Sequence, residues 1–201
     1  MYIDSFDIKK IDMKLGAAFS KCNYDNMSDE LKALMENACN DVIKTASPKA
    51  VFEVFDIDSI CEENEKVSFA DTEFILTGKS ICKHLKGSKK AVFMAATLGT
   101  DVDRLIKKET VSKLEYAVFL DGLAGALVEM VCDETEKIIS DTYNPGSMTY
   151  RFGLGYGDLS IEYEEEFLRL IKAGSYLGLC VTESNLLIPC KSVACIIGLR
   201  Y

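Results

Sequence analysis

Residues 151–158 read Arg-Phe-Gly-Leu-Gly-Tyr-Gly-Asp, so glycine takes every second position from 153 to 157. Glycine lets the main chain turn sharply and lets its amides approach an anion without a side chain in the way. Arg151 adds a permanent charge that could grip a ligand carboxylate through two hydrogen bonds, or could instead pair with a carboxylate of the protein surface. Tyr156 adds a flat ring with a hydroxyl, either for contact with a ligand or for packing. The stretch indicates a small-molecule site. Alone it is also typical of a tight loop, because a dinucleotide-binding turn has a different spacing.

A long helix is predicted before this stretch, over residues 111–140, because no proline interrupts it and residues 116–131 are nearly all apolar. Gly122 and Gly125 replace bulky side chains within it, which indicates that another backbone approaches closely. Asp121 is costly in such a helix unless it is paired. We expect an ion pair there, with contact to a ligand or partner as the alternative.

An amphipathic helix is predicted after the stretch, over residues 161–172, capped by Asp158 or Ser160 and ended by Gly174. Its acidic side chains are expected on a solvated face, or against a basic partner. They are Glu162, Glu164, Glu165 and Glu166.

Further elements are predicted on both sides. The apolar run at 91–97 indicates a buried strand, and residues 28–46 form a helix that Ser28 caps and Pro48 stops. Other strands are predicted at 1–8, 50–57, 66–69, 74–77, 177–182, 186–188 and 193–199, and other helices at 80–85 and 101–108.

Composition bounds the class of protein. The chain has 201 residues, a net charge of -9 and 48% hydrophobic residues, which fits one soluble domain and argues against nucleic acid or an anionic membrane as partner. No signal peptide or membrane-spanning run is evident, so a cytoplasmic location is expected. The eight cysteines are scattered, which favours reduced thiols; Cys190 and Cys195 have neither redox nor zinc spacing and are expected in the core. His84 is expected to be solvated or half-buried.

Several segments, in order, resemble the activation domain of vitamin B12-dependent methionine synthase. Residues 151–156 resemble its R-x-x-x-G-Y signature, and residues 179–184 its L-T-E-S segment. Residues 189–198 resemble the ending P-x-K-S-V-S-G-I-I-G, and residues 95–104 are similar to A-T-L-G-x-x-V-D-R of free-standing members. The match covers residues 91–199 well and residues 1–90 only loosely.

The resemblance implies a single α+β domain over residues 1–201, with a twisted antiparallel sheet flanked by helices. It implies an S-adenosylmethionine-binding module that supports reductive remethylation of the cobalamin of a partner chain, rather than a complete enzyme. That partner would be a cobalamin-dependent methionine synthase without its own activation domain, and a flavodoxin-type protein would donate the electron.

The resemblance also implies the ligand-binding residues. Arg151, Gly153, Gly155 and Tyr156 match the signature. The family places a glutamate where this sequence has Gly125, so Glu129, one turn later, is the expected substitute. Glu183 is expected in a strand, where it would hydrogen-bond the glycine loop, with a role as an acid as the alternative. The family continues past the last strand with a ligand-contacting tyrosine, whereas this sequence stops at Tyr201. Part of the usual pocket is therefore expected to be missing, and the activity is expected to depend on a separate synthase chain that supplies the corrinoid and the catalytic modules.

Two other functions fit the same residues. One is an independent S-adenosylmethionine-dependent methyltransferase or corrinoid-reducing enzyme, suggested by the glycine stretch and the cysteine-rich C-terminal strands. The other is a regulatory subunit that has lost the ligand, suggested by Gly125 and the end of the chain at Tyr201.

Overall fold

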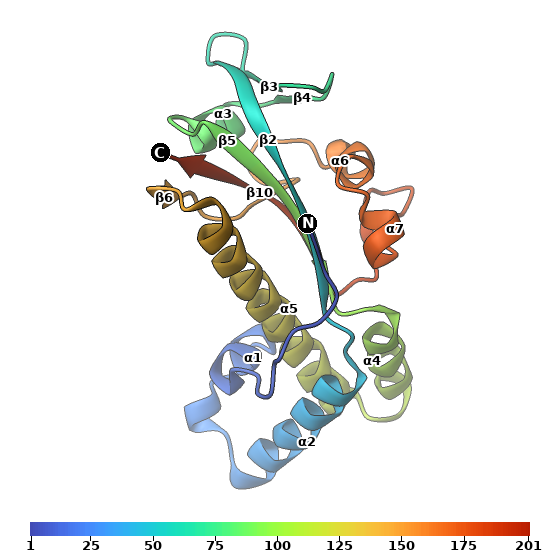
Figure 1. The fold of residues 1–201 in the computed structure, drawn as a ribbon. Coiled ribbons are helices and arrows are strands. Elements are labelled where there is room, and N and C mark those ends of the chain that lie inside the picture. Colours follow the sequence, from blue (N-terminus) through green and yellow to red (C-terminus); the bar gives the residue numbers. More distant parts are fainter.

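The computed structural model describes all residues from 1 to 201 and contains one eight-stranded antiparallel sheet. The strands follow the order β4-β3-β2-β5-β10-β6, with β1 beside β2 and β7 beside β10 (Figure 1). Their bounds are β1 Tyr2–Ile3, β2 Lys49–Cys61, β3 Lys66–Phe69, β4 Ile75–Thr77, β5 Lys90–Thr97, β6 Ser147–Met148, β7 Phe152–Gly153 and β10 Ser192–Arg200. A separate hairpin joins β8 Cys180–Val181 to β9 Leu187–Ile188.

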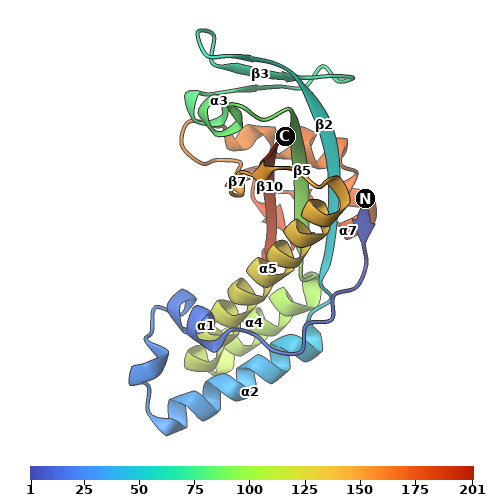
Figure 2. The ribbon, with the colours of Figure 1, turned by 60° about the vertical axis from the view of Figure 1, so that its left-hand side comes forward.

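The centre of the sheet is covered on both faces. β5 lies between β2 and β10 and seven of its eight residues are buried, which explains its uninterrupted apolar sequence. Cys195 and Ile197 of β10 join a core with α1 Met13–Phe19, α2 Asp29–Thr45, α4 Thr100–Ser112 and α5 Leu114–Tyr143. Ala194 and Ile196 join the other core, with α3 Lys79–Leu85, α6 Glu164–Leu170 and α7 Ala173–Leu177. Because neighbouring strand residues point to opposite faces, α5 and α6 lie on opposite sides of the sheet (Figures 1 and 2).

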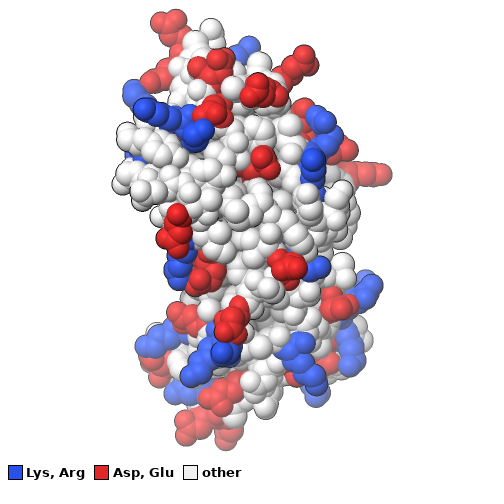
Figure 3. Space-filling view, in the orientation of Figure 1, with Lys and Arg blue, Asp and Glu red and all other residues white.

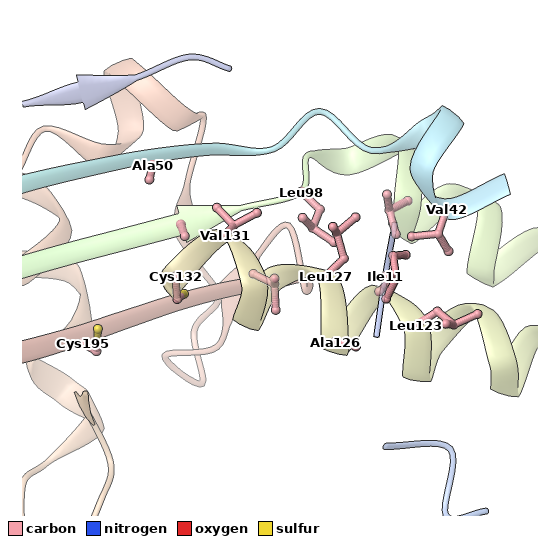
Figure 4. Close-up of a cluster of buried hydrophobic side chains, with 14 of the residues drawn as sticks. Ile11, Val42, Ala50, Leu98, Leu123, Ala126, Leu127, Val131, Cys132 and Cys195 are labelled. Carbon is pink, nitrogen blue, oxygen red and sulfur yellow. The ribbon is translucent and has the colours of Figure 1, made fainter. Parts of the chain in front are cut away.

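The first core extends beyond the sheet. The C-terminal half of α5 packs against the sheet, and its N-terminal half continues into a bundle with α1, α2 and α4 (Figure 2). Figure 4 shows Leu98, Val42 and Ile11 gathered beside Leu127 of α5, although these residues are far apart in the sequence. This packing gives α5 an anchor at each end, so its sheet-facing half is held firmly in place.

Gly122 is where α1 and α5 meet closely. A Cβ atom there would lie 2.1 Å from Ser20 Oγ and 2.6 Å from the Gly16 carbonyl oxygen. At Gly125 the nearest atom is 3.5 Å away, in the Phe19 ring. The predicted close backbone approach is confirmed at Gly122, whereas Gly125 has ordinary contact distances.

Gly122→Ala is expected to lower the free energy of unfolding by about 1–3 kcal/mol, because the added methyl overpacks the α1–α5 contact. Gly125→Ala is the matched control and should raise it by about 0.5–1 kcal/mol, since alanine favours the helix and has room. Urea unfolding of both variants measures the difference. Equal stability for the two would contradict this account of the contact.

Some predicted element boundaries were wrong. The helix predicted from residue 111 begins at Leu114, because Lys113 has φ -147° and Val111 belongs to α4. The single helix predicted at 161–172 is a 3-10 turn, Ile161–Tyr163, followed by α6. The chain turns at Lys172 in a left-handed conformation. Gly174, which was predicted to end the helix, lies inside α7 instead. The strand predicted at 177–182 shortens to β8.

The surface carries charges of both signs. On the face drawn in Figure 3, Lys and Arg are interspersed with Asp and Glu. None of the helices has both the length and the apolar character needed to cross a membrane.

Candidate functional site

A cleft of about 580 Å³ lies beside β10, where β7 stops pairing with it. This volume is within the usual range of small-molecule sites, about 300–1,000 Å³. The lining residues come from α5, the 150–156 segment, α6, β9 and β10. They are Glu129, Asp133, Glu136, Tyr150, Arg151, Gly153, Leu154, Tyr156, Glu164, Leu187, Ser192, Val193, Ala194 and Cys195.

The Arg151 guanidinium is held by three carboxylates on one face of α5. Nη2 lies 2.7 Å from Glu129 Oε2 and Nη1 lies 2.8 Å from Asp133 Oδ1; Nη1 also donates to Glu136 Oε1. Positions 129, 133 and 136 are four and three residues apart, so they share a helix face. Of these acids only Glu129 was predicted as a site residue, although the spacing of all three was visible in the sequence.

The Arg151 side chain remains positively charged beside these carboxylates. Burial works against the charged form, but the hydrogen bond with Asp133 and the nearby acids raise its pKa overall. Three acids against one guanidinium give the cluster a net charge of -3 + 1 = -2. Arginine has five N–H donors and three are engaged, so Nε–H and one Nη2–H are left, enough to hold one further carboxylate.

The glycine stretch folds largely on itself. β7 pairs with Cys195 and Ile196, the Gly155 N–H donates to the Leu159 carbonyl over 3.0 Å, and the Tyr156 N–H donates to the Gly153 carbonyl over 3.2 Å. The prediction that the spaced glycines turn their amides toward an anion is therefore wrong for Gly155, because the turn satisfies its N–H and that of Tyr156. The Tyr156 ring lies against Gly153 and is 61% exposed, so its free side is available to a ligand.

Gly157 serves packing rather than binding. Its φ is +60°, and a Cβ there would lie 2.5 Å from Ser80 Oγ. This close approach brings Asp158 to the start of α3, where its carboxylate accepts from the Lys79 and Ser80 N–H groups at 2.8 and 2.9 Å. These hydrogen bonds lower the Asp158 pKa. Asp158 thus caps α3. Of the two predicted caps for the segment that begins at residue 161, Asp158 and Ser160, it is Ser160 that caps the turn at Ile161–Tyr163.

The open edge of β10 forms the back of the cleft. β6 and β7 pair with β10 at residues 195, 196, 199 and 200, so no strand lies beside Ser192–Ala194 on that side. An uncovered edge leaves alternate main-chain N–H and C=O groups without a strand partner. The cleft therefore offers main-chain hydrogen-bonding groups, though from β10 more than from the glycine turn.

Glu164 was missed as a site residue. The acidic pattern predicted a solvated helix face there, but the Glu164 side chain is buried, lines the cleft, and has an Oε2 atom without a hydrogen-bond partner. Burial raises its pKa to about 7. The neighbouring residues Glu165 and Glu166 are exposed as predicted, so Glu164 alone of the three turns inward.

Glu183 does not take its expected place. It is exposed in the turn between β8 and β9, forms no side-chain hydrogen bond, and is not among the residues lining the cleft. Thr182 instead closes the turn, where its hydroxyl accepts from the Ser184 and Leu186 N–H groups. The expected hydrogen bond between Glu183 and the glycine loop is therefore absent.

The remaining polar candidates have structural roles. Asp121 pairs with Lys191 at 2.8 Å, as expected. His84 is buried rather than solvated and shares a hydrogen bond with the Thr149 hydroxyl; burial lowers its pKa. Cys195 is in the core as predicted, whereas Cys190 is exposed. No group of three or more His, Cys, Asp or Glu side chains is arranged to hold a metal ion.

Among solved structures, the chain is similar to the reactivation domain of MetH bound to AdoHcy. The TM-score is 0.70, and the alignment covers 100% of this chain and 78% of that one at 14% sequence identity. This chain has the MetH reactivation domain fold. The α+β architecture with an antiparallel sheet flanked by helices is thereby confirmed. A scan against protein families and a search of curated proteins match nothing.

Proposed function

We propose that this chain is an S-adenosylmethionine-binding activation module for a cobalamin-dependent methionine synthase that lacks such a domain. The observation that carries the proposal is the cleft beside β10, which Arg151, Gly153 and Tyr156 line within a MetH reactivation domain fold. The solved domain of that fold was crystallised with AdoHcy, the demethylated form of the proposed ligand.

The charges of the cleft suit this ligand. S-adenosylmethionine carries a carboxylate, an ammonium group and a sulfonium, and its net charge at neutral pH is +1. The α5 acids and Arg151 together carry -2, so the cluster attracts a cation while Arg151 keeps two N–H donors for the carboxylate. Glu129 and Glu136 are the less exposed acids and the better placed to hold the ammonium group.

The flat parts of the ligand have matching surfaces. Tyr150 and Tyr156 line the cleft and are 69% and 61% exposed, so their rings offer faces on which an adenine base can stack. The open edge of β10 at Ser192–Ala194 supplies main-chain donors and acceptors. When bound, the ligand supplies a methyl group; the chain's residues hold and orient it at an open cleft that a partner can reach.

The synthase would bring the cobalamin, and a flavodoxin-type donor the electron, in the cytoplasm. In this division of labour the cobalt centre belongs to the partner chain, and this chain contributes the methyl donor. One observation favours the alternative of a regulatory subunit without ligand: three carboxylates already occupy Arg151. Binding decides between the two.

Isothermal titration of the full chain with S-adenosylmethionine is the first test, and a dissociation constant in the micromolar range is expected. Adding the chain to a cobalamin-loaded methionine synthase without its activation domain should then restore remethylation. Arg169→Ala, which removes an exposed pair with Glu166 away from the cleft, should change neither result. Absence of binding, both alone and with the synthase, would favour the ligand-free regulatory subunit.

A further inference from the structure

Glu164 is the feature of the cleft that the proposed function leaves unexplained. It is the first residue of α6, only 5% exposed, and its Oε2 atom has no hydrogen-bond partner. Buried polar atoms in native proteins nearly always have a partner, so an unpaired carboxyl in a cleft calls for one supplied from outside. Its inward position is fixed by the packing of Phe167 and Leu168, on the same helix, into the core beneath.

No charged side chain pairs with Glu164. Burial is the only cause of its raised pKa, and no salt bridge involves it. The titratable groups that share its cleft are Glu129, Asp133, Glu136, Tyr150, Arg151, Tyr156 and Cys195. Those on or beside the elements packed against α6 are Glu162, Tyr163, Lys172, Tyr176 and Cys180. The carboxyl is therefore placed to receive a neutral hydrogen-bond donor rather than to balance a fixed cation of the protein.

Glu164 and the α5 acids reach the cleft from different directions. Successive side chains of β10 point alternately into the two cores, with α5 on one face of the sheet and α6 on the other. The cleft lies at the edge of the sheet and is lined by residues from both helices. A ligand whose charged end meets Arg151 and Glu129 thus extends its other end toward α6.

We propose that the Glu164 carboxyl accepts a hydrogen bond from a neutral O–H or N–H donor on the nucleoside part of the ligand, either the sugar hydroxyls or the amino group of the base. This inference rests on the proposed function, which supplies the ligand. It assigns to Glu164 the recognition of the nucleoside, separate from the recognition of the amino-acid end by Arg151.

The affinity for the ligand is expected to depend on pH. A donor favours the ionised carboxylate, so ligand binding lowers the Glu164 pKa from about 7 and releases a proton. Lowering the Glu164 pKa by about one on binding corresponds to a factor of about ten in affinity over the whole pH range, of which about fivefold should be gained between pH 6 and pH 8. The ligand's own amino group also titrates in this range, so the informative quantity is the ratio of wild-type to variant affinity at each pH.

The test is calorimetric titration of the full chain with S-adenosylmethionine at pH 6 and pH 8, for the wild type, Glu164→Gln and Glu165→Gln. Glu165 is the exposed neighbour on the same helix and loses the same charge. We expect Glu164→Gln to bind about tenfold more weakly than the wild type at pH 8 and only about twofold more weakly at pH 6, because only a charge-assisted hydrogen bond is lost. Glu165→Gln should match the wild type at both.

The two proposals fail in different ways. If the wild type binds but Glu164→Gln shows the same affinity ratio at both pH values, Glu164 does not contact the ligand, while the binding function stands. If the wild type binds the ligand at neither pH, both alone and with the synthase, both proposals are overturned. Ligand analogues without the 2′ or 3′ hydroxyl, or without the base amino group, identify the donor: the matching analogue should bind the wild type and Glu164→Gln equally. If no analogue binds the wild type and Glu164→Gln with equal affinity, the contact is also refuted.

Discussion

Arg151→Ala is expected to weaken S-adenosylmethionine binding at least 100-fold. In the proposed function the guanidinium gives its two remaining N–H donors to the ligand carboxylate, and a charge-assisted pair of that kind typically accounts for about 2–5 kcal/mol when one partner is truncated. The substitution also leaves Glu129, Asp133 and Glu136 close together without a counter-charge. The free energy of unfolding at pH 7 should fall by about 1–3 kcal/mol.

Urea unfolding at pH 7 measures the stability effect of Arg151→Ala, and calorimetry measures its effect on binding. Arg151→Lys keeps the charge, but an ammonium group cannot hold the three α5 carboxylates and the ligand carboxylate together. This variant should therefore retain most of the free energy of unfolding and little of the affinity for the ligand. Wild-type affinity in Arg151→Ala would remove the basis for the proposed orientation of the ligand.

Glu164→Gln is expected to stabilise the unliganded protein by about 3 kcal/mol at pH 8. The pKa of Glu164 rises from its ordinary 4.5 to about 7 in the folded chain, and a pKa difference of one between the folded and unfolded states corresponds to about 1.4 kcal/mol. The folded state holds this proton up to about pH 7, whereas the unfolded state releases it near 4.5. Stability contributed by the neutral acid is therefore complete below about pH 4.5 and is lost as the pH rises through 7.

Glutamine has no such proton, so the variant should equal the wild type at pH 4 and exceed it above pH 7. Urea unfolding across pH 4–8 gives the comparison, with Glu165→Gln as the exposed control that should follow the wild type. A glutamate that lowers stability in the free protein yet lines its cleft is typical of functional residues, which often oppose stability. If the difference in free energy of unfolding between Glu164→Gln and the wild type were the same at pH 8 and at pH 4, the Glu164 carboxyl would be solvated rather than buried.

The secondary structure followed closely from the sequence where one local signal dominates. Ser28 and Pro48 mark the ends of α2 because capping and the lack of a proline N–H act within a few residues. The apolar run of β5 indicated a strand covered on both faces, and it lies at the centre of the sheet. Predictions were wrong near Lys113, Lys172 and Gly174, where a bend of the chain, rather than residue preference, sets the boundary.

The candidate site was only partly visible in advance. Arg151 and Tyr156 were identified through their neighbours in the sequence, and both line the cleft. Glu183 was placed there through motif order alone, which carries no information about side-chain direction. Glu164 was overlooked because three of its neighbours are also acidic, and the pattern of a charged helix face does not reveal which member turns inward.

The sequence by itself determined α2, β5 and most of α5, the close approach at Gly122 and the segment around Arg151, since each depends on residues that are neighbours along the chain or on one helix face. Only the tertiary structure decided that three α5 acids surround Arg151, that Gly155 and Tyr156 satisfy their own amides, and that Glu164 is buried without a partner. The physical reason is that burial, electrostatics and hydrogen-bond satisfaction depend on distances across the fold, which the local pattern of residues does not contain.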